Sequence, residues 1–337
     1  MRRSFPRSIG AAMVVLGVLV ATSPATGQQK DTTAPPPRTP WGHPDLQGTW
    51  DRHSITPLER PKQLEGREFL TEEEAAQLEQ AAILANTDEE RPSDIGRDVS
   101  SAYNDFWWDR ATKVVSTRRT SLIVDPPDGK VPPLTARAEE RAKLESTRPV
   151  GSLGTGGRGA DSWLDRSLWE RCITQGSSRL ASGAYNANFQ IFQSADAVVV
   201  LHEQIHEARV IPLDGRPHLP PSVRQWLGDS RGRWEGNTLV VETTNFSDKT
   251  NFRGSTDGLR MIERISRADA ETLNYEVTFE DPSTWTRPWT VQMPMPKTAG
   301  SMYEYACHEG NYGLKGILAG ARAEEKAAEE ARKKGSR

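Results

Sequence analysis

The sequence predicts a mainly β protein, built as an antiparallel barrel or sandwich, with a helical and extended segment before it and a helix at the C-terminus. Two observations predict this fold. From about residue 186 onward the chain consists of short β-branched or aromatic runs, and Asp-Gly or Gly-Asn turns separate them without intervening helices. The runs are NFQIFQ, AVVVLHE, EARVIPL, NTLVVETTNF, LRMIERISR, TLNYEVTFE, PWTVQMP and MYEYACHE.

Composition divides the chain into five segments. The first is typical of a signal peptide, because Arg2, Arg3 and Arg7 precede the short apolar run IGAAMVVLGVLVA and a small-residue cleavage site ends at Gly27. A proline-rich linker follows it. The predicted boundaries are a signal peptide at 1–27, the linker at 28–40, an N-terminal mixed helix and hairpin segment at 41–160, the antiparallel β domain at 161–316, and a charged C-terminal helix or tail at 317–337.

Within the N-terminal segment the sequence predicts two helices and a hairpin. TEEEAAQLEQAAILAN, at 71–86, begins with a capping box of Thr71 and Glu74 and continues with alanine-rich periodicity. PLTARAEERAKLEST, at 133–147, predicts a second, exposed helix. Between the helices, ATKVVSTRRTSLIVDPPDG at 111–129 predicts a β-hairpin that ends in a Pro-Asp-Gly turn.

Charge and cysteine content indicate the compartment and the partners. The formal net charge is −3, and removal of the arginine-containing signal makes the chain more acidic, which argues against a nucleic-acid partner. The apolar run of the signal is too short to span a bilayer and there is no second one, so we expect no membrane insertion after signal removal and a periplasmic or secreted location. Cys172 and Cys307 fit that location as one disulfide. The alternative is that Cys307 is a nucleophile beside His308.

The stretch LHEQIH contains His202, Glu203 and His206 in the H-E-x-x-H order of zinc metalloproteases. On a helix the two histidines would share one face and could bind one metal ion. On a strand they would lie about 13 Å apart and could not. Three consecutive valines precede the stretch, which favours a strand, and we therefore predict no metal site. A zinc metalloprotease is only a remote alternative.

On a strand, Glu203 would share an otherwise apolar face with Val199, Leu201 and Ile205. A carboxylate in such a row needs a charged partner or has a raised pKa. One interpretation is a structural ion pair with Arg209 beyond the next bend. The other is a catalytic acid in a cavity, with Arg209 binding the substrate.

The stretch LDGRPHLPP brings three ionisable residues into one turn. Asp214 and His218 could act as orienting carboxylate and general base, and Arg216 could bind an anionic group of a substrate. The structural alternative is a turn that Asp-Gly shapes and the prolines stiffen. Neither interpretation is favoured by the residues themselves.

Two further stretches place acids beside aromatic residues. In GDSRGRWEGNTLVVETTNF, Trp234 could stack on a sugar while Glu235 acts as acid or nucleophile. The favoured interpretation is structural: Trp234 covers a core and Glu235 forms a salt bridge at the end of a strand. In YEYACHEGNYG, Glu304 is a candidate catalytic acid and His308 a candidate substrate-binding residue on the same face. The favoured alternative is a structural strand that the disulfide holds in place. The ten tryptophans, among them Trp285, suit either a large core or an aromatic-lined pocket.

Several of these stretches together resemble a widespread family of uncharacterised exported bacterial proteins, common in acidobacteria. The resemblance extends over nearly the whole mature chain. The stretches that carry it are PWGHPDLQGTW, ITPLERP, VIPLDGRPHLP, GDSRGRWEGNTLVVETTNF, EDPSTWTRPWT and YEYACHEGNYG. The resemblance implies that the two cysteines, the D-G-R-P-H turn and the W-E-G-x-T-L-V-V strand belong to a family pattern. It implies no activity for any residue.

These observations lead to one predicted fold and two predicted functions. The fold is a calycin-like antiparallel barrel or sandwich, which can enclose a small-molecule or carbohydrate ligand without a cofactor. We favour a hydrolase or lyase that acts on a carbohydrate or plant-derived small molecule; the alternative is a non-catalytic binding protein for an amphipathic molecule. The enzyme requires Glu203, His218 and Glu235 to converge on one point. The sequence predicts no oligomeric state.

Overall fold

The computed structural model describes residues 37–85, 109–146, 159–176, 186–249 and 252–335. All of them belong to one compact unit, Pro36–Arg337. The predicted signal peptide, most of the predicted linker and parts of the 41–160 segment lie outside the described residues.

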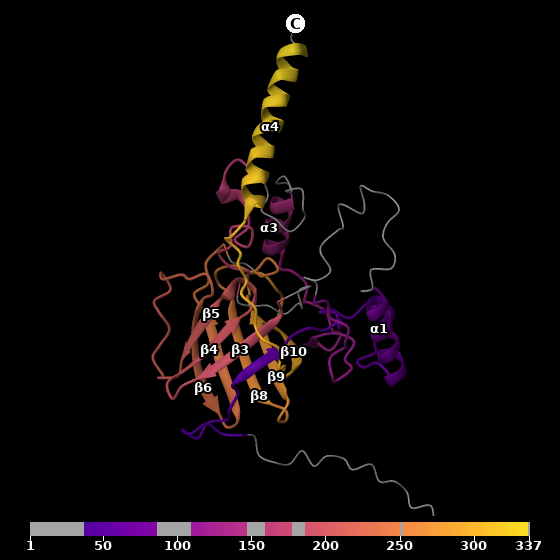
Figure 1. The fold of residues 1–337 in the computed structure, drawn as a ribbon, viewed down its shortest axis with the longest axis vertical. Helices are drawn as coiled ribbons and strands as arrows, with labels where there is room; N and C mark the ends of the chain where they lie inside the picture. The colour runs from indigo at the N-terminus through magenta and orange to yellow at the C-terminus, as the bar shows by residue number, and fades with distance from the viewer. Residues whose placement is uncertain (1–36, 86–108, 147–158, 177–185, 250–251, 336–337) are drawn as a thin grey trace, which may run out of the picture. The chain divides into compact units, whose positions relative to one another are not determined.

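In the described residues, ten antiparallel strands form two sheets, and Figure 1 shows their arrangement. The four-stranded sheet has the order β1-β3-β4-β5, with β1 at Gly48–Asp51, β3 at Asn188–Gln193, β4 at Ala197–His202 and β5 at Ala208–Pro212. The six-stranded sheet has the order β2-β10-β9-β8-β7-β6. Its strands are β2 at Ile123–Asp125, β6 at Asp229–Glu235, β7 at Thr238–Thr244, β8 at Arg260–Arg267, β9 at Thr272–Glu280 and β10 at Trp289–Pro296.

The two sheets remain separate ladders in the described part of the chain, so a sandwich fits the structure and a closed barrel does not. Near one edge, Trp50 of β1 forms an isolated bridge with Lys297, and the Thr298 amide donates to the Thr49 carbonyl at 3.0 Å. The mainly antiparallel β fold that the strand-length runs predict is therefore confirmed, whereas closure into a barrel is not observed.

Alternation along the strands sends one set of side chains into a shared core. On β4, Val198 and Val200 are buried at 0% and 3% exposure, and they join a cluster that includes Leu239, Val241 and Met261 from the six-stranded sheet. Aromatic rings fill one part of this core: Trp289 stacks on Phe279 at 4.6 Å and meets Trp285 edge-on at 5.4 Å. Of the two uses expected for the tryptophans, these residues therefore serve the core.

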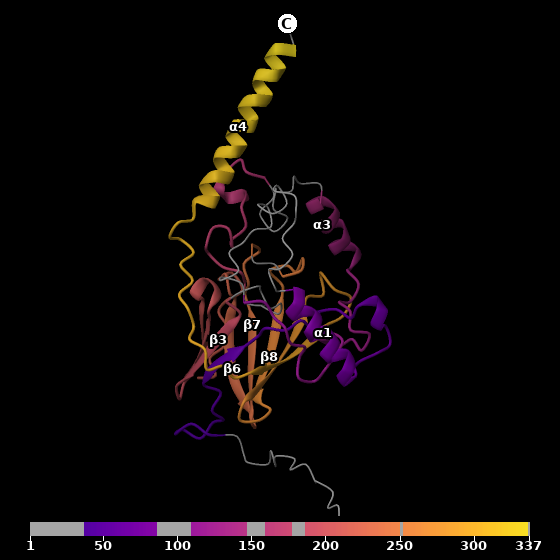
Figure 2. The same cartoon turned by 45° about the vertical axis from the view of Figure 1, so that its right-hand side comes forward.

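The predicted helices are present (Figure 2), and the C-terminal one begins at Tyr312, before its predicted start at 317. Helix α1 spans Glu72–Ala85, and its capping box is confirmed by hydrogen bonds between the Thr71 amide and Glu74 Oε2 and between the Glu74 amide and Thr71 Oγ1. Helix α3 spans Ala136–Ser146, and α4 spans Tyr312–Gly335 without a buried residue. Three single 3₁₀ turns complete the described elements: η1 at Lys62–Leu64, η3 at Trp163–Asp165 and η4 at Gln204–His206.

Two local predictions are wrong. The hairpin expected at 111–129 does not form; only β2 is a strand there, and its partner is β10, through the pairs Ile123–Val291 and Asp125–Thr290. MYEYACHE is not a strand, because hydrogen bonds and a disulfide, described below, hold this segment without a ladder. The 41–160 segment also supplies β1 and β2, so it contributes an edge strand to each sheet.

One glycine is required by the turn before β6. Gly228 has φ +71°, and a Cβ there would lie 2.6 Å from the Thr244 carbonyl oxygen and 2.9 Å from Phe246. We expect Gly228→Ala to lower the free energy of unfolding by about 2–3 kcal/mol, because backbone strain adds to the clash. Gly236→Ala is the matched control: φ is +60°, but no atom lies within 4 Å. Urea denaturation measures both, and equal losses would contradict the steric argument.

Candidate functional site

The HEQIH stretch forms a tight turn instead of a helix. Strand β4 ends at His202, and η4 follows with φ +60° at Ile205 and +42° at His206, so no continuous α-helix aligns the two histidines. His202 is buried, whereas the exposed His206 places Nδ1 3.1 Å from the Tyr305 carbonyl oxygen. Among the described residues, no group of three His, Cys, Asp or Glu side chains is placed to hold a metal ion. The zinc alternative thus has no structural support here.

Glu203 lies in this turn and not in an apolar strand row, which corrects the predicted alternation. The core face of β4 consists of Val198, Val200 and His202. The Glu203 carboxylate is 3% exposed and accepts hydrogen bonds from Asn188 Nδ2 at 3.0 Å and the Tyr303 amide at 2.9 Å. It therefore joins the segment before α4 to β3 and does not pair with Arg209.

Arg209, a predicted substrate-binding residue, instead crosses from β5 to β8 inside the sandwich. Its guanidinium donates to both Glu263 oxygens at 2.6 and 2.7 Å, and the Tyr275 hydroxyl donates to Glu263 at 2.8 Å. Arg209 is 6% exposed and Glu263 is 0% exposed. Burial, followed by the charge of Glu263, raises the pKa of Tyr275, so its hydroxyl stays protonated and remains a donor. Arg209, Glu263 and Tyr275 therefore join the two sheets, and Arg209 is not placed to bind a substrate.

The ionisable residues of the D-G-R-P-H turn make two separate contacts. Asp214 pairs with Arg216 at the surface, where Arg216 Nε donates at 2.6 Å. His218 contacts different residues: its Nδ1 lies 2.9 Å from the buried Asp229 carboxylate, and its Nε2 lies 3.8 Å from Glu242. His218 is therefore held at the start of β6, apart from Asp214 and Arg216.

The remaining candidates are scattered. Glu235, at the end of β6, pairs with Arg233 at 2.7 Å and Arg264 at 3.1 Å. It is six residues along the strand from Asp229, the partner of His218, which is about 20 Å. Trp234 stacks on His43 at 4.9 Å, and Glu304 and His308 are exposed in an irregular segment. The predicted acid–base set of Glu203, Asp214, His218, Glu235 and Glu304 is therefore not brought together in one site.

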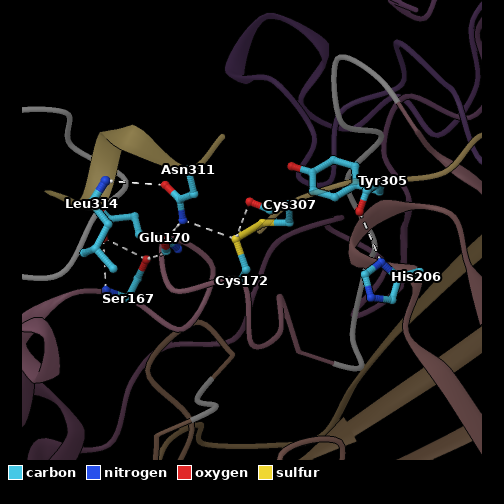
Figure 3. Close-up of a disulfide and its surroundings, with 8 residues drawn as sticks. All are labelled: Ser167, Glu170, Cys172, His206, Tyr305, Cys307, Asn311 and Leu314. Carbon is cyan, nitrogen blue, oxygen red and sulfur yellow. Dashed lines mark hydrogen bonds between the residues drawn. A yellow bond between two sulfur atoms is a disulfide. The ribbon is translucent and has the colours of Figure 1, made fainter. Parts of the chain in front are cut away.

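The disulfide between Cys172 and Cys307 is present, with a Cα–Cα distance of 5.7 Å (Figure 3). It excludes a free Cys307 nucleophile, because neither cysteine is a free thiol. Asn311 Nδ2 donates to the Glu170 carbonyl at 3.1 Å beside the bridge, and the His206–Tyr305 contact lies farther along the same segment (Figure 3). A disulfide is typical of proteins outside the cytoplasm. No described helix is long and apolar enough to cross a membrane.

A histidine that the sequence did not single out has the geometry of a general base. His53 follows β1, and its Nδ1 lies 2.6 Å from Asp51 Oδ1. The His53 amide donates to the same oxygen at 2.8 Å, which fixes the carboxylate against the ring. The imidazole is only 9% exposed. Its buried Nε2 has no hydrogen-bond partner, and Asp109 Oδ2 lies 3.5 Å from it.

His53 lines a groove of about 400 Å³, within the size range of small-molecule sites. Glu79 of α1 shapes one wall, because it accepts from Lys113 Nζ at 2.7 Å and from the Val114 amide at 3.2 Å. The other residues that line the groove are Asp51, Asp109, Arg110, Ala111, Thr112, Lys113, Val114, Val115, Ser116, Thr272, Pro294 and Pro296. Tryptophan is not among them, so the aromatic lining that the sequence suggested is not found in this groove.

The His53–Asp51 pair has opposite pKa shifts. Burial alone would lower the pKa of His53, but the hydrogen bond and charge of Asp51, with Asp109 behind it, raise the pKa above 6.5. Burial likewise opposes ionisation of Asp51, yet the hydrogen bonds from His53 lower its pKa below 3.8. The pair therefore stabilises the fold between these values, and its contribution falls as the pH rises through the pKa of folded His53 or drops through that of folded Asp51.

The local sequence holds a signal for this pair. In an extended chain, residues i and i+2 point to the same side, so Asp51 and His53 in WDRHS could meet. Nothing in that stretch shows that α1 and the 109–115 segment lie beside it. Comparisons with protein-family models, with curated proteins and with solved structures found no match. The site is therefore interpreted from its own geometry.

Proposed function

We propose that the protein is an exported acid–base enzyme, a hydrolase or lyase, in which His53 is the catalytic base and the groove holds a small polar molecule. One observation carries the proposal: a nine-tenths buried histidine lines a groove, a carboxylate holds one ring nitrogen, and the other nitrogen lacks a hydrogen-bond partner. A carboxylate on Nδ1 fixes the tautomer that leaves Nε2 as the proton acceptor. The disulfide is compatible with a periplasmic or secreted location.

Each group in the groove has a part in the chemistry. In hydrolysis, Nε2 takes a proton from water as the water oxygen bonds to the substrate, and the imidazolium returns the proton to the leaving group. In elimination, Nε2 takes a C–H proton and returns it to the departing oxygen. Asp51 stabilises the imidazolium in both reactions. Because Nε2 is buried, the reaction requires the exposed side chain of Asp109, 3.5 Å from Nε2, to move aside when the substrate binds.

Substitution of the base tests the assignment. We expect His53→Gln to lower kcat/KM by about 10²–10⁴, the usual contribution of general acid–base catalysis. The full chain is screened against aryl glycosides, aryl esters and polyuronates, by release of the aryl alcohol or formation of a carbon–carbon double bond. His43→Gln is the matched control, since His43 stacks on Trp234 and does not line the groove. Equal activity of His53→Gln and the wild type, or no turnover of any substrate by the wild type, would count against the proposal.

Asp51→Asn tests the role of the carboxylate. Activity of a base rises with pH through the pKa of His53, which the Asp51 charge raises. Removal of that charge lowers the pKa, so the acidic limb of the kcat/KM profile is expected to move to lower pH while the plateau falls by about tenfold or more. A purely structural role would change the melting temperature without moving this limb. An unmoved limb would show that Asp51 does not act through His53.

A further inference from the structure

The buried nitrogen of His53 is a ligand atom that the fold holds in a fixed direction. Asp51 Oδ1 lies 2.6 Å from Nδ1 and accepts the ring proton there, so the lone pair of the neutral imidazole is on Nε2. Nε2 is buried and has no hydrogen-bond partner. Histidines that bind metal ions almost always have this arrangement, in which the other ring nitrogen donates to a carboxylate or carbonyl. The ring is therefore placed to bind a cation as well as to accept a proton.

Asp109 supplies a second ligand atom, and its separation from the first indicates the kind of cation. Its Oδ2 lies 3.5 Å from His53 Nε2. Zinc bonds of about 2.0–2.2 Å to nitrogen and oxygen, at the tetrahedral angle, hold two ligand atoms about 3.3–3.5 Å apart. An ammonium group that donates to both atoms at about 2.8 Å would hold them about 4.6 Å apart. The observed separation fits a small metal ion and is too short for an amine.

The charge of the groove also favours a cation. Among the described residues that line it, three are carboxylates and two are permanent cations: Asp51, Glu79, Asp109, Arg110 and Lys113. With His53 neutral, as its role as a base requires, the lining therefore has an excess of one negative charge. Asp109 is 68% exposed, so its carboxylate can adjust to a bound ion while water completes the coordination.

A second cluster of a histidine and carboxylates lacks this excess of negative charge. His218 Nδ1 lies 2.9 Å from Asp229, and its Nε2 lies 3.8 Å from Glu242. Arg231 pairs with Asp229 at 2.8 Å, and Arg260 pairs with Glu242 at 2.9 Å. Both carboxylates have a counter-charge already, and a metal ion here would meet two guanidinium groups. His218 is therefore a matched control for His53.

We propose that His53 Nε2 and Asp109 Oδ2 bind a divalent transition-metal ion such as zinc, and that the ion inhibits the protein by occupying the nitrogen that accepts the proton. The described residues supply no third protein ligand, so water fills the other positions and the dissociation constant is about 1–100 µM. The metal site does not depend on catalysis, whereas the inhibition rests on the proposed function.

Calorimetric titration of the full chain with zinc chloride tests the site. We expect one ion to bind to the wild type, His53→Gln to abolish this binding, and Asp109→Asn to weaken it at least tenfold. Asp51→Asn should weaken it about 10–100-fold, because the carboxylate behind a metal-binding histidine sets its orientation and basicity. His218→Gln should bind zinc as the wild type does. Calcium, which takes oxygen ligands, should not bind.

Inhibition gives a second measurement, in which each variant is compared with its own rate without zinc. At zinc concentrations about ten times the dissociation constant, we expect kcat/KM of the wild type to fall about tenfold, because about one chain in eleven remains free. Asp109→Asn should resist this concentration, and its exposed position makes it a substitution that leaves the fold intact.

The outcomes separate the metal site from the catalytic proposal. No zinc binding by the wild type at about millimolar concentration, or equal affinity of His53→Gln and the wild type, would overturn the metal site. If zinc binds at His53 and turnover does not change, the metal site stands and the catalytic role of His53 falls. If His53→Gln lowers turnover but binds zinc as the wild type does, the catalytic role stands and the metal site falls.

Discussion

Replacement of Glu263 by alanine is expected to lower the free energy of unfolding by about 3–5 kcal/mol, because it leaves a buried guanidinium without its counter-charge. Glu263 is fully buried and accepts both hydrogen bonds from Arg209 and one from the Tyr275 hydroxyl. Removal of the carboxylate therefore strands three donors in the core. Urea denaturation followed by tryptophan fluorescence measures the loss.

A double substitution distinguishes the net contribution of the ion pair to the free energy of unfolding from the loss caused by removing only one of its partners. E263L/R209M removes both charges and keeps the volume apolar, so it is expected to recover most of the stability that Glu263→Ala loses. Tyr275→Phe, which removes one donor, should cost about 1 kcal/mol. A loss below about 1 kcal/mol for Glu263→Ala would show that water enters this part of the core and replaces the carboxylate.

The second large effect is expected from removal of the disulfide. Cys172 and Cys307 are separated by 135 residues, and in the chain-entropy model a loop of that length gives about 5 kcal/mol. C172A/C307A is therefore expected to unfold at a much lower urea concentration, because its unfolded chain gains freedom. The contact between Glu203 and the Tyr303 amide keeps part of the segment in place in the folded state.

Reducing agent supplies the control for this prediction. It should lower the stability of the wild-type protein by nearly the same amount and leave C172A/C307A unchanged. If C172A/C307A loses less than about 1 kcal/mol, the contacts of Asn311, Glu203 and His206 suffice to hold the segment, and the bridge adds little.

Local chemistry explains which elements could be predicted. The capping box that begins α1 is written in four consecutive residues, Thr71 to Glu74, and the strands after residue 186 show their period within five to nine residues. The disulfide was the only pairing that two cysteines allow. The capping box and the strand periodicity depend on residues close together in the sequence, and the two cysteines have no alternative partner.

The wrong predictions concern segments whose structure depends on residues far away in the sequence. Ile123 reads as half of a hairpin, but its partner is Val291. MYEYACHE alternates like a strand, yet Glu203 and His206 bind its backbone in place of a neighbouring strand. The same cause hid the groove, since α1, the 109–115 segment and β10 surround His53 only after folding. The predicted acid–base set failed for the same reason. Asp214 and His218 are close in sequence, but Asp214 pairs with Arg216 and His218 contacts Asp229.

The edge strands have a consequence for how fast the chain folds. β1 pairs with β3 through Gly48 and Ile191, and β2 pairs with β10 through Ile123 and Val291. Each of these edge strands therefore pairs with a strand that is synthesised much later. Such long loops must close before any pairing stabilises them, and chains of this kind fold slowly. During synthesis β1 therefore remains unpaired until β3 has been made, and β2 remains unpaired until β10 has been made.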